Sequence, residues 1–257
     1  MKKITCHYEE KNIEEINENQ NENQNENQNE NQNENQDIIL LIMNCFKYKD
    51  KSDYQKKTWL LNLPKHIRYY HVIGIPELNN PYVFDNENNI LYISCKDDYC
   101  SLPKKVIRSY QAIYETFNFK YIFKTDDDQM VNDVIFFNIL TEILKNKEDY
   151  IHYGGNIITI KLPQISTYNI IHNELPNNIV IKPTKYCNGR FYFLSKKAIS
   201  FLITKKSLID KEYIEDYSIG FYLDKNMKDY MLFLNTDNYF RDFEINTNKI
   251  VKIQIKI

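Results

Sequence analysis

The chain lacks any apolar run long enough to cross a membrane, since its longest, IILLIM at residues 38–43, has the length of a strand. It also lacks the apolar segment of a signal peptide, because Lys2 and Lys3 are followed by polar residues. Glycine is sparse, with 5 in 257 residues, and there is one tryptophan. These absences predict a protein with no integral membrane segment and a cytoplasmic location.

Paired cysteines are also missing. The five cysteines are odd in number and do not have the spacing of zinc ligands. They are Cys6, Cys45, Cys95, Cys100 and Cys187. Free thiols in a reducing compartment are the expectation, with one buried disulfide as the open alternative.

The first 36 residues contain almost nothing that could form a core. The tetrapeptide NENQ occurs five times in succession over residues 17–36, without an apolar residue. Such composition predicts a disordered low-complexity tail at 1–36 and a single domain at 37–257. The tail has 3 lysines and 9 glutamates, so the remainder has a net charge of +4, from 30 basic and 26 acidic residues. This mild excess suits a phosphate-bearing ligand, while the dispersal of the basic residues argues against nucleic-acid binding.

Strands and helices are expected to alternate after residue 36. The sequence predicts strands near 38–46, 69–75, 89–95 and 120–125, and a charged helical stretch at 47–60. The strongest helix pattern covers 103–117, with Ser101 as its cap and Pro103 in its first turn. Its expected apolar face contains Val106, Ile107, Tyr110, Ile113 and Tyr114. This order predicts an α/β fold with a mainly parallel sheet, helices on both faces and a ligand site at the carboxyl ends of the strands.

Three consecutive acids follow the predicted strand at 120–125. Asp126, Asp127 and Asp128 repel one another, so a cation is expected to meet them. Mg²⁺ or Mn²⁺ typically takes one or two protein carboxylates and leaves its other positions for phosphate oxygens and water. The triplet therefore suggests a nucleotide-sugar site. The alternative is a solvated, Asp-rich turn.

Five ordered blocks carry a resemblance to a known family. They are QKKTW at 55–59, DDYCSLPKK at 97–105, FKTDDDQMVN at 123–132, KYCNGRFYFLSKKAI at 185–199 and EDYSIG at 215–220. The chain resembles glycosyltransferase family 31, the fringe-like and β-1,3-galactosyltransferase or N-acetylglucosaminyltransferase group, over about residues 38–223. The resemblance implies a GT-A fold.

The resemblance also implies an activity and roles for particular residues. An inverting, metal-dependent enzyme would move a hexose or N-acetylhexosamine from a UDP-sugar donor to a hydroxyl of a glycan or glycoprotein acceptor. Asp128 would bind Mn²⁺ (or Mg²⁺), and Asp126 and Asp127 would contact the donor. Asp216 would be the general base, although an acidic pair such as Glu215 and Asp216 also commonly decorates a helix N-terminus.

Three further positions belong to the same expected donor site. Lys105 is expected to support the donor pocket. Gly189 is expected where the backbone passes close to the substrate or where φ is positive. Lys124 could contact a phosphate or could be a solvated flank of the strand.

Two departures from the family pattern bear on activity. Phe191 stands where the family has a second glycine, and would either narrow the substrate pocket or fill core. Neighbouring aromatics could stack on a sugar, although alternating aromatics in a strand more often form core. The family usually supplies a C-terminal histidine ligand, whereas the last histidine here is His172, so Asn235 or Asp237 is the candidate substitute.

These departures leave other functions open. One alternative is an inactive or weakly active GT-A protein that acts as a glycan-binding or scaffold protein. A metal-dependent phosphotransferase is disfavoured, because no phosphate-cradling, glycine-rich loop follows the first strand.

Overall fold

The computed structural model describes residues 37–246 and 249–251. The low-complexity tail predicted at 1–36 lies outside these residues. The strands are β1 Ile38–Met43, β2 Ile67–Gly74, β3 Tyr82–Asp85, β4 Ile90–Ile93, β5 Tyr121–Asp126, β6 Gln129–Val131, β7 Tyr153–Ile160, β8 Gln164–Ile165, β9 Val180–Ile181, β10 Thr184–Ser195, β11 Leu232–Phe233, β12 Phe240–Asp242, β13 Glu244–Asn246 and β14 Lys249–Val251. The helices are α2 Lys49–Lys56, α3 Leu102–Thr116, α4 Ile135–Leu144, α5 Lys196–Thr204, α6 Lys206–Ile209 and α7 Glu215–Tyr222.

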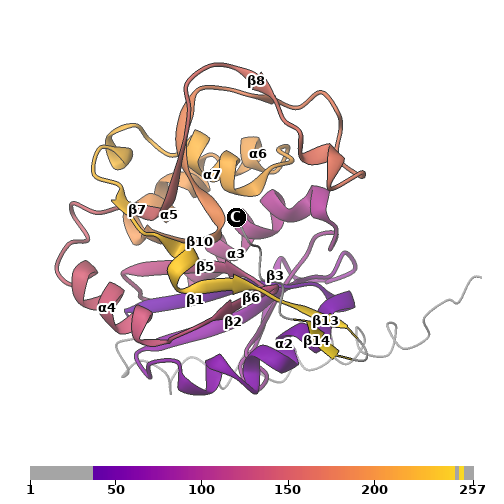
Figure 1. Ribbon diagram of the computed structural model, residues 1–257, viewed down its shortest axis with the longest axis vertical. Coiled ribbons are helices and arrows are strands. Elements are labelled where there is room, and N and C mark those ends of the chain that lie inside the picture. Colours follow the sequence, from indigo (N-terminus) through magenta and orange to yellow (C-terminus); the bar gives the residue numbers. More distant parts are fainter. Residues whose placement is uncertain (1–36, 247–248, 252–257) are drawn as a thin grey trace, which may run out of the picture.

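Eight of the strands form one mixed sheet in the order β11-β7-β10-β5-β1-β2-β4-β3 (Figure 1). Strands β5, β1, β2 and β4 are mutually parallel, and β10 and β3 run against the rest of the sheet. The predicted mainly parallel α/β sheet is therefore confirmed. The sequence reading missed β3, a half-buried strand at the edge.

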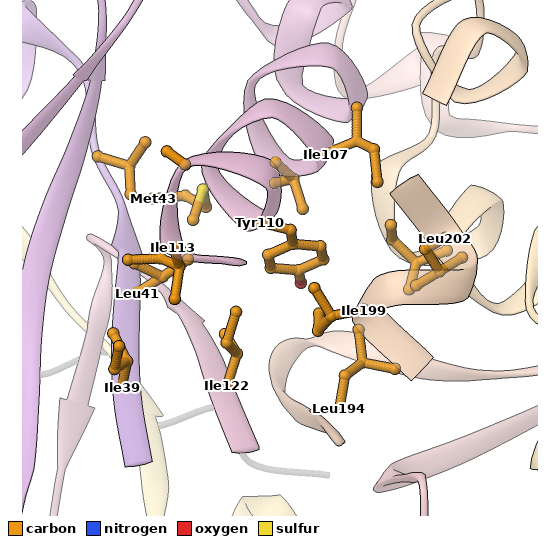
Figure 2. Close-up of a cluster of buried hydrophobic side chains, with 14 of the residues drawn as sticks. Ile39, Leu41, Met43, Ile107, Tyr110, Ile113, Ile122, Leu194, Ile199 and Leu202 are labelled. Carbon is orange, nitrogen blue, oxygen red and sulfur yellow. The ribbon is translucent and has the colours of Figure 1, made fainter. Parts of the chain in front are cut away.

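The alternation of side chains along β1 divides the core into two layers. Ile39, Leu41 and Met43 pack against α3 and α5 on one face (Figure 2), whereas Ile38, Leu40 and Ile42 pack with Trp59 and the phenylalanines of α4 on the other. Successive side chains of a strand point to opposite faces, so a run of six apolar residues requires cover on both sides. All six are at most 4% exposed.

Helix α3 follows its sequence pattern with two corrections. Val106, Ile107, Tyr110 and Ile113 are completely buried, but Tyr114 is 38% exposed and does not belong to the apolar face. Pro103 lies in the first turn as predicted. Ser101 makes no side-chain capping bond; instead the carboxylate of Asp98 accepts the Ser101 backbone N–H at 2.8 Å, which begins the short helix η3 (Tyr99–Ser101) that leads into α3.

Membrane-spanning helices and disulfides can be assessed for the described residues. Among them, no helix combines the length and the apolar character needed to traverse a membrane. Cys45, Cys95, Cys100 and Cys187 are free, and Cys6 lies outside the described part of the chain.

Candidate functional site

The acid triplet lies in the turn between β5 and β6, at the carboxyl end of the sheet. Asp126 is the last residue of β5, and the backbone N–H of Asp127 donates to the carbonyl of Met43 at the end of β1, at 2.9 Å. The chain then enters β6, which pairs with β12 instead of the main sheet. The triplet therefore lies beside the ends of two central parallel strands, where ligands of open α/β sheets bind.

Within the described part of the chain, the carboxylate of each acid of the triplet has one partner. Asp126 Oδ1 is 2.8 Å from Lys124 Nζ, and Asp127 Oδ1 is 3.2 Å from Lys51 Nζ. Asp128 Oδ1 accepts from Gln129 Nε2 at 3.0 Å. Asp127 is only 8% exposed, so a freely solvated turn is the wrong description of it.

Burial raises the pKa values of two acids of the triplet more than the nearby lysines lower them. Desolvation raises the pKa of Asp126 to about 7, opposed by Lys124 and reinforced by Asp128, although 31% of the Asp126 side chain reaches the surface. Desolvation likewise raises the pKa of Asp127 to about 6, against the attraction of Lys51. Both shifts show that the anionic forms are disfavoured without a further cation.

The donor set fits a hard divalent cation whose coordination a ligand completes. All the donors are carboxylate oxygens, and within the described residues the second oxygen of each acid accepts no hydrogen bond. The same residues contain no ready-made cluster of three or more His, Cys, Asp or Glu side chains arranged to hold a metal. Mg²⁺ and Mn²⁺ often bind in this incomplete way, with phosphate and water as the remaining ligands.

Lys124 is a buried counter-charge. Its side chain is 1% exposed, and Nζ lies 2.8 Å from Asp126, 3.0 Å from Glu215 and 3.0 Å from the Gly189 carbonyl oxygen. Burial lowers its pKa, but the two carboxylates outweigh burial and the net shift is upward. A lysine has three N–H donors, and these three acceptors use them all. The solvated-flank interpretation is thus wrong, and no donor is left for a phosphate.

Glu215 belongs to the same buried network. It begins α7 and accepts a short hydrogen bond from the Tyr192 hydroxyl, which itself lies 2.6 Å from the Tyr110 hydroxyl. Glu215 and both tyrosines are at most 5% exposed. This carboxylate therefore connects Lys124 to the core between the sheet and α3.

Asp216 follows in the first turn of α7 and is held through both of its oxygens. Oδ2 accepts the Gly189 N–H at 3.0 Å, and Oδ1 accepts the Tyr217 N–H at 2.7 Å. The residue is 8% exposed, and burial together with the charge of Glu215 raises its pKa to about 6. Solvated decoration of a helix N-terminus does not describe a buried carboxylate held in this way.

Gly189 connects the two acidic segments. Its N–H donates to Asp216 and its carbonyl accepts from Lys124. A Cβ added here would lie 3.6 Å from Asp216 Oδ2 and from Lys124 Nζ, which is ordinary contact, and its φ is not positive, so that part of the expectation was wrong. The groups that lie close to the Gly189 backbone are the charged side chains of Asp216 and Lys124.

Lys105 fixes the loop that follows β1. It is 4% exposed, and its Nζ donates to the Asn44 carbonyl at 2.5 Å and to Asp97 at 2.7 Å. The other oxygen of Asp97 accepts the Phe46 N–H at 2.9 Å. Lys105 therefore positions a loop at the carboxyl end of the sheet, and these two acceptors use two of its three N–H donors.

The C-terminal segment brings a different acid from those predicted. Asp237 is 66% exposed and pairs with Arg190 at 2.6 Å, and Asn235 is also exposed. Asp242 of β12 instead accepts from Gln129 Nε2 at 2.8 Å, and the same nitrogen donates to Asp128. Arg190 binds both oxygens of Asp242, at 2.9 and 3.1 Å. Sequence reasoning missed Asp242 and Arg190, because the pairing of β6 with β12 brings Asp242 to the triplet and the pairing of β10 with β5 brings Arg190 there.

The aromatics around Gly189 are core residues. Phe191 is completely buried and packs on Phe123, Phe136 and Phe240, with ring centroids 5.0–5.6 Å apart. Its neighbours Tyr186, Tyr192 and Phe193 are at most 5% exposed. Phe191 thus fills core, and these side chains offer no open face to a sugar.

A surface hollow of about 680 Å³ lies elsewhere, beside Lys120, Glu148 and Ser195. Ser195 pairs with Tyr121 at the start of β5, so this hollow is near the amino end of that strand. Lys120 and Glu148 form an ion pair of 3.1 Å there, and none of the site residues predicted from the sequence lines the hollow. The chemistry therefore favours the carboxyl end of the sheet.

Comparisons with solved structures find remote glycosyltransferases. A glycosyltransferase involved in the glycosylation of the major capsid of PBCV-1 is 11% identical over 77% of this chain and 82% of its own, with a TM-score of 0.44. GlyE, a glycosyltransferase of Streptococcus pneumoniae TIGR4, is 12% identical over 78% of this chain and 45% of its own, with a TM-score of 0.41. The galactosyltransferase LgtC, solved with donor and acceptor sugar analogues, is 13% identical over 77% of this chain and 73% of its own, with a TM-score of 0.42. Likenesses this remote say nothing about the donor or acceptor of this chain.

A search of curated proteins finds no match. The family model described as Galactosyltransferase matches residues 51–230. That range contains the acid triplet, Gly189 and Asp216, and confirms the family-31 resemblance and the GT-A type of fold expected from the motifs. Because the match spans well over half of its residues, the chain belongs to the Galactosyltransferase family and is a glycosyltransferase.

Proposed function

We propose that the protein is an inverting, metal-dependent enzyme that moves a hexose or N-acetylhexosamine from a UDP-sugar to a hydroxyl of a glycan or glycoprotein. One observation carries this proposal. The backbone N–H of Gly189 donates to Asp216 and its carbonyl accepts from Lys124, which also pairs with Asp126. A candidate base and a candidate donor-binding triplet, about 90 residues apart in sequence, thus become neighbours.

The triplet is the donor side of the proposed site. Asp128 would hold Mn²⁺ or Mg²⁺, and Asp126 and Asp127 would accept hydrogen bonds from the donor or from bound water through their free oxygens. A bound ion would supply Lewis-acid stabilisation of the departing diphosphate. Asp242 of β12, sharing Gln129 with Asp128, replaces Asp237 and Asn235 as the proposed carboxylate of the C-terminal segment.

Asp216 is the acceptor side. Inversion requires a base that removes the proton of the attacking hydroxyl, and a pKa of about 6 leaves this carboxylate ionised at neutral pH yet more basic than an ordinary aspartate. Each carboxylate oxygen has a second lone pair beyond the one used by Gly189 or Tyr217. The two backbone bonds fix the direction of the carboxylate, which is the positioning that general-base catalysis needs.

Substituting Asp216→Asn tests the base. The amide keeps the shape of the side chain but cannot take the proton, so sugar transfer should fall by about 10²–10⁴ while UDP-sugar affinity stays near wild type. Asp224→Asn, just beyond the other end of α7, is the matched control and should transfer at the wild-type rate. Wild-type transfer by Asp216→Asn would disprove this assignment. An absence of transfer by the wild-type protein itself would favour the scaffold alternative, which Phe191 no longer supports because it is core.

Substituting Asp128→Ala tests the metal. In wild type, calorimetry should show UDP binding that is much weaker without Mn²⁺ than with it, and the variant should lose this difference. The thermal midpoint serves as the folding check. Equal UDP affinity with and without Mn²⁺ in the wild-type protein would contradict metal-dependent donor binding at the triplet.

A further inference from the structure

The arm, residues 161–183, has the most exposed apolar side chains of the described chain. It projects from the end of β7 above α7 and returns to β10 (Figure 1). Ile170 and Ile171 are each 78% exposed and Leu162 is 75% exposed. Single exposed apolar residues are common, but adjacent ones at a protruding tip mark a surface that meets another apolar phase.

The arm has two different faces. Ile181 of β9 is buried with Ile214 and Tyr217, so one face is fixed to the domain. Ile165 and Val180 lie directly opposite each other across the β8–β9 pair and are 61% and 54% exposed. Cross-strand partners share a face, and the next residue of a strand points to the other face. Ile165 and Val180 therefore form an uncovered apolar pair that faces away from the domain.

The charge around this apolar face is positive. Lys161, Lys182 and Lys185 are exposed, while Glu174 is the one acid in residues 161–185. The same residues contain no Arg, Trp, Phe or Met, four of the types enriched at protein–protein interfaces, where lysine is depleted. Their one tyrosine, Tyr168, packs against the domain. Aliphatic side chains flanked by lysines are typical of surfaces that enter a lipid headgroup region, because a lysine stem lies along apolar material while its charge meets lipid phosphate.

We propose that the arm docks the protein onto an anionic phospholipid surface. The exposed aliphatic side chains enter the boundary between headgroups and acyl chains, and the lysines lie at the level of the phosphates. This goes beyond the proposed sugar transfer and does not rest on it.

The arm is also fixed near the candidate site. The His172 ring stacks on Tyr99 of η3 with centroids 3.7 Å apart, and Cys100 Sγ donates to the Glu174 carbonyl at 3.4 Å. The short helix η3 that contains Tyr99 leads into α3, beside Asp97, whose carboxylate accepts from Lys105 and from the Phe46 N–H. Docking would therefore hold the carboxyl end of the sheet near the lipid surface.

Vesicle sedimentation of the full chain, without metal or nucleotide sugar, tests the proposal. The protein should sediment with phosphatidylcholine vesicles that contain phosphatidylglycerol, and more weakly with phosphatidylcholine alone or at high salt. Ile170→Gln with Ile171→Gln should lower the partition coefficient by at least about tenfold, because two side chains lose their apolar burial. Leu162→Gln provides a second, independent variant, and Lys161→Gln with Lys185→Gln should lower binding to the anionic vesicles alone.

The matched control is Ile139→Gln with Ile143→Gln, at residues that are 47% and 39% exposed. Both belong to α4, a helix that lies away from the arm (Figure 1). This variant should bind vesicles as wild type does. The proposal is overturned if wild type binds neither vesicle, or if the α4 and arm variants lose binding equally. It is also overturned if the arm variants abolish a dimer or a protein complex and leave vesicle binding unchanged. A failure of sugar transfer has no bearing on these outcomes.

Discussion

Lys120 immediately precedes β5 and Lys124 lies within it, and each lysine lies between two carboxylates in a different environment. Lys120 Nζ is 3.2 Å from Asp37 and 3.1 Å from Glu148, with 44% of its side chain exposed. Lys124 Nζ is 2.8 Å from Asp126 and 3.0 Å from Glu215, with 1% exposed. The partners and distances are nearly the same, so burial is the variable that differs.

The comparison shows that the same ion-pair chemistry has different consequences inside and outside the core. Exposed pairs contribute about 0–1 kcal/mol, because water screens them and ordering two long side chains opposes them. A buried pair gains little over an apolar replacement of both partners, but removing one partner leaves an unpaired charge in a poor solvent. The Lys124 network is therefore expected to be sensitive to each of its members, which suits a site that must hold two acids in fixed positions.

The largest expected effect is that of Lys124→Met. The substitution leaves Asp126 and Glu215 buried without their cation, and should lower the free energy of unfolding by about 3–5 kcal/mol. Urea denaturation at neutral pH measures it. Repeating the titration near pH 5 sharpens the test, because Asp126, whose pKa burial raises to about 7, can then be protonated and the loss should shrink. A loss below about 1 kcal/mol at neutral pH would mean that burial does not distinguish the two lysines.

The next effect is the pH dependence that Asp216 contributes. Its pKa is about 6 in the folded chain, above the value near 3.9 of an unfolded one, so the folded state binds its proton more tightly. Stability from this group is therefore greatest below about pH 4 and falls as pH rises to about 6, by on the order of 2–3 kcal/mol. Asp216→Asn cannot titrate, so the variant should gain on wild type over that window in metal-free urea titrations. A stability difference that stays constant with pH would contradict the raised pKa.

The smallest effect is expected for Lys120→Met, the matched control for Lys124→Met. Removing an exposed lysine from two partly exposed carboxylates should change the free energy of unfolding by about 0.2–1 kcal/mol. The same urea titrations measure it, and added salt should reduce the difference further. A loss as large as that of Lys124→Met would show that the position on β5, and not burial, decides the energetics.

Several elements follow from local sequence. The apolar run at 38–43 is a strand buried on both faces, and the pattern of 103–117 is a helix whose buried face contains Val106, Ile107 and Tyr110. The capping bond expected from the Ser101 side chain is not present, because the Ser101 backbone N–H instead donates to the Asp98 carboxylate. Strand β3 was missed since its four residues are only half-buried and it has one neighbour in the sheet.

The five motif blocks in order were enough to indicate the family, which the match over residues 51–230 confirms. The α/β order and the position of the acid triplet at a strand end also follow from the chain, because alternating strands and helices place successive carboxyl ends at one edge of a sheet. The tertiary structure decided what the side chains do there. Lys124 is a buried counter-charge, Gly189 bridges Lys124 and Asp216, and Asp242 lies beside Asp128 in place of Asp237. These contacts join residues 27 to 113 positions apart, and the local pattern of residues does not encode which distant polar side chains meet, so only the folded chain specifies them.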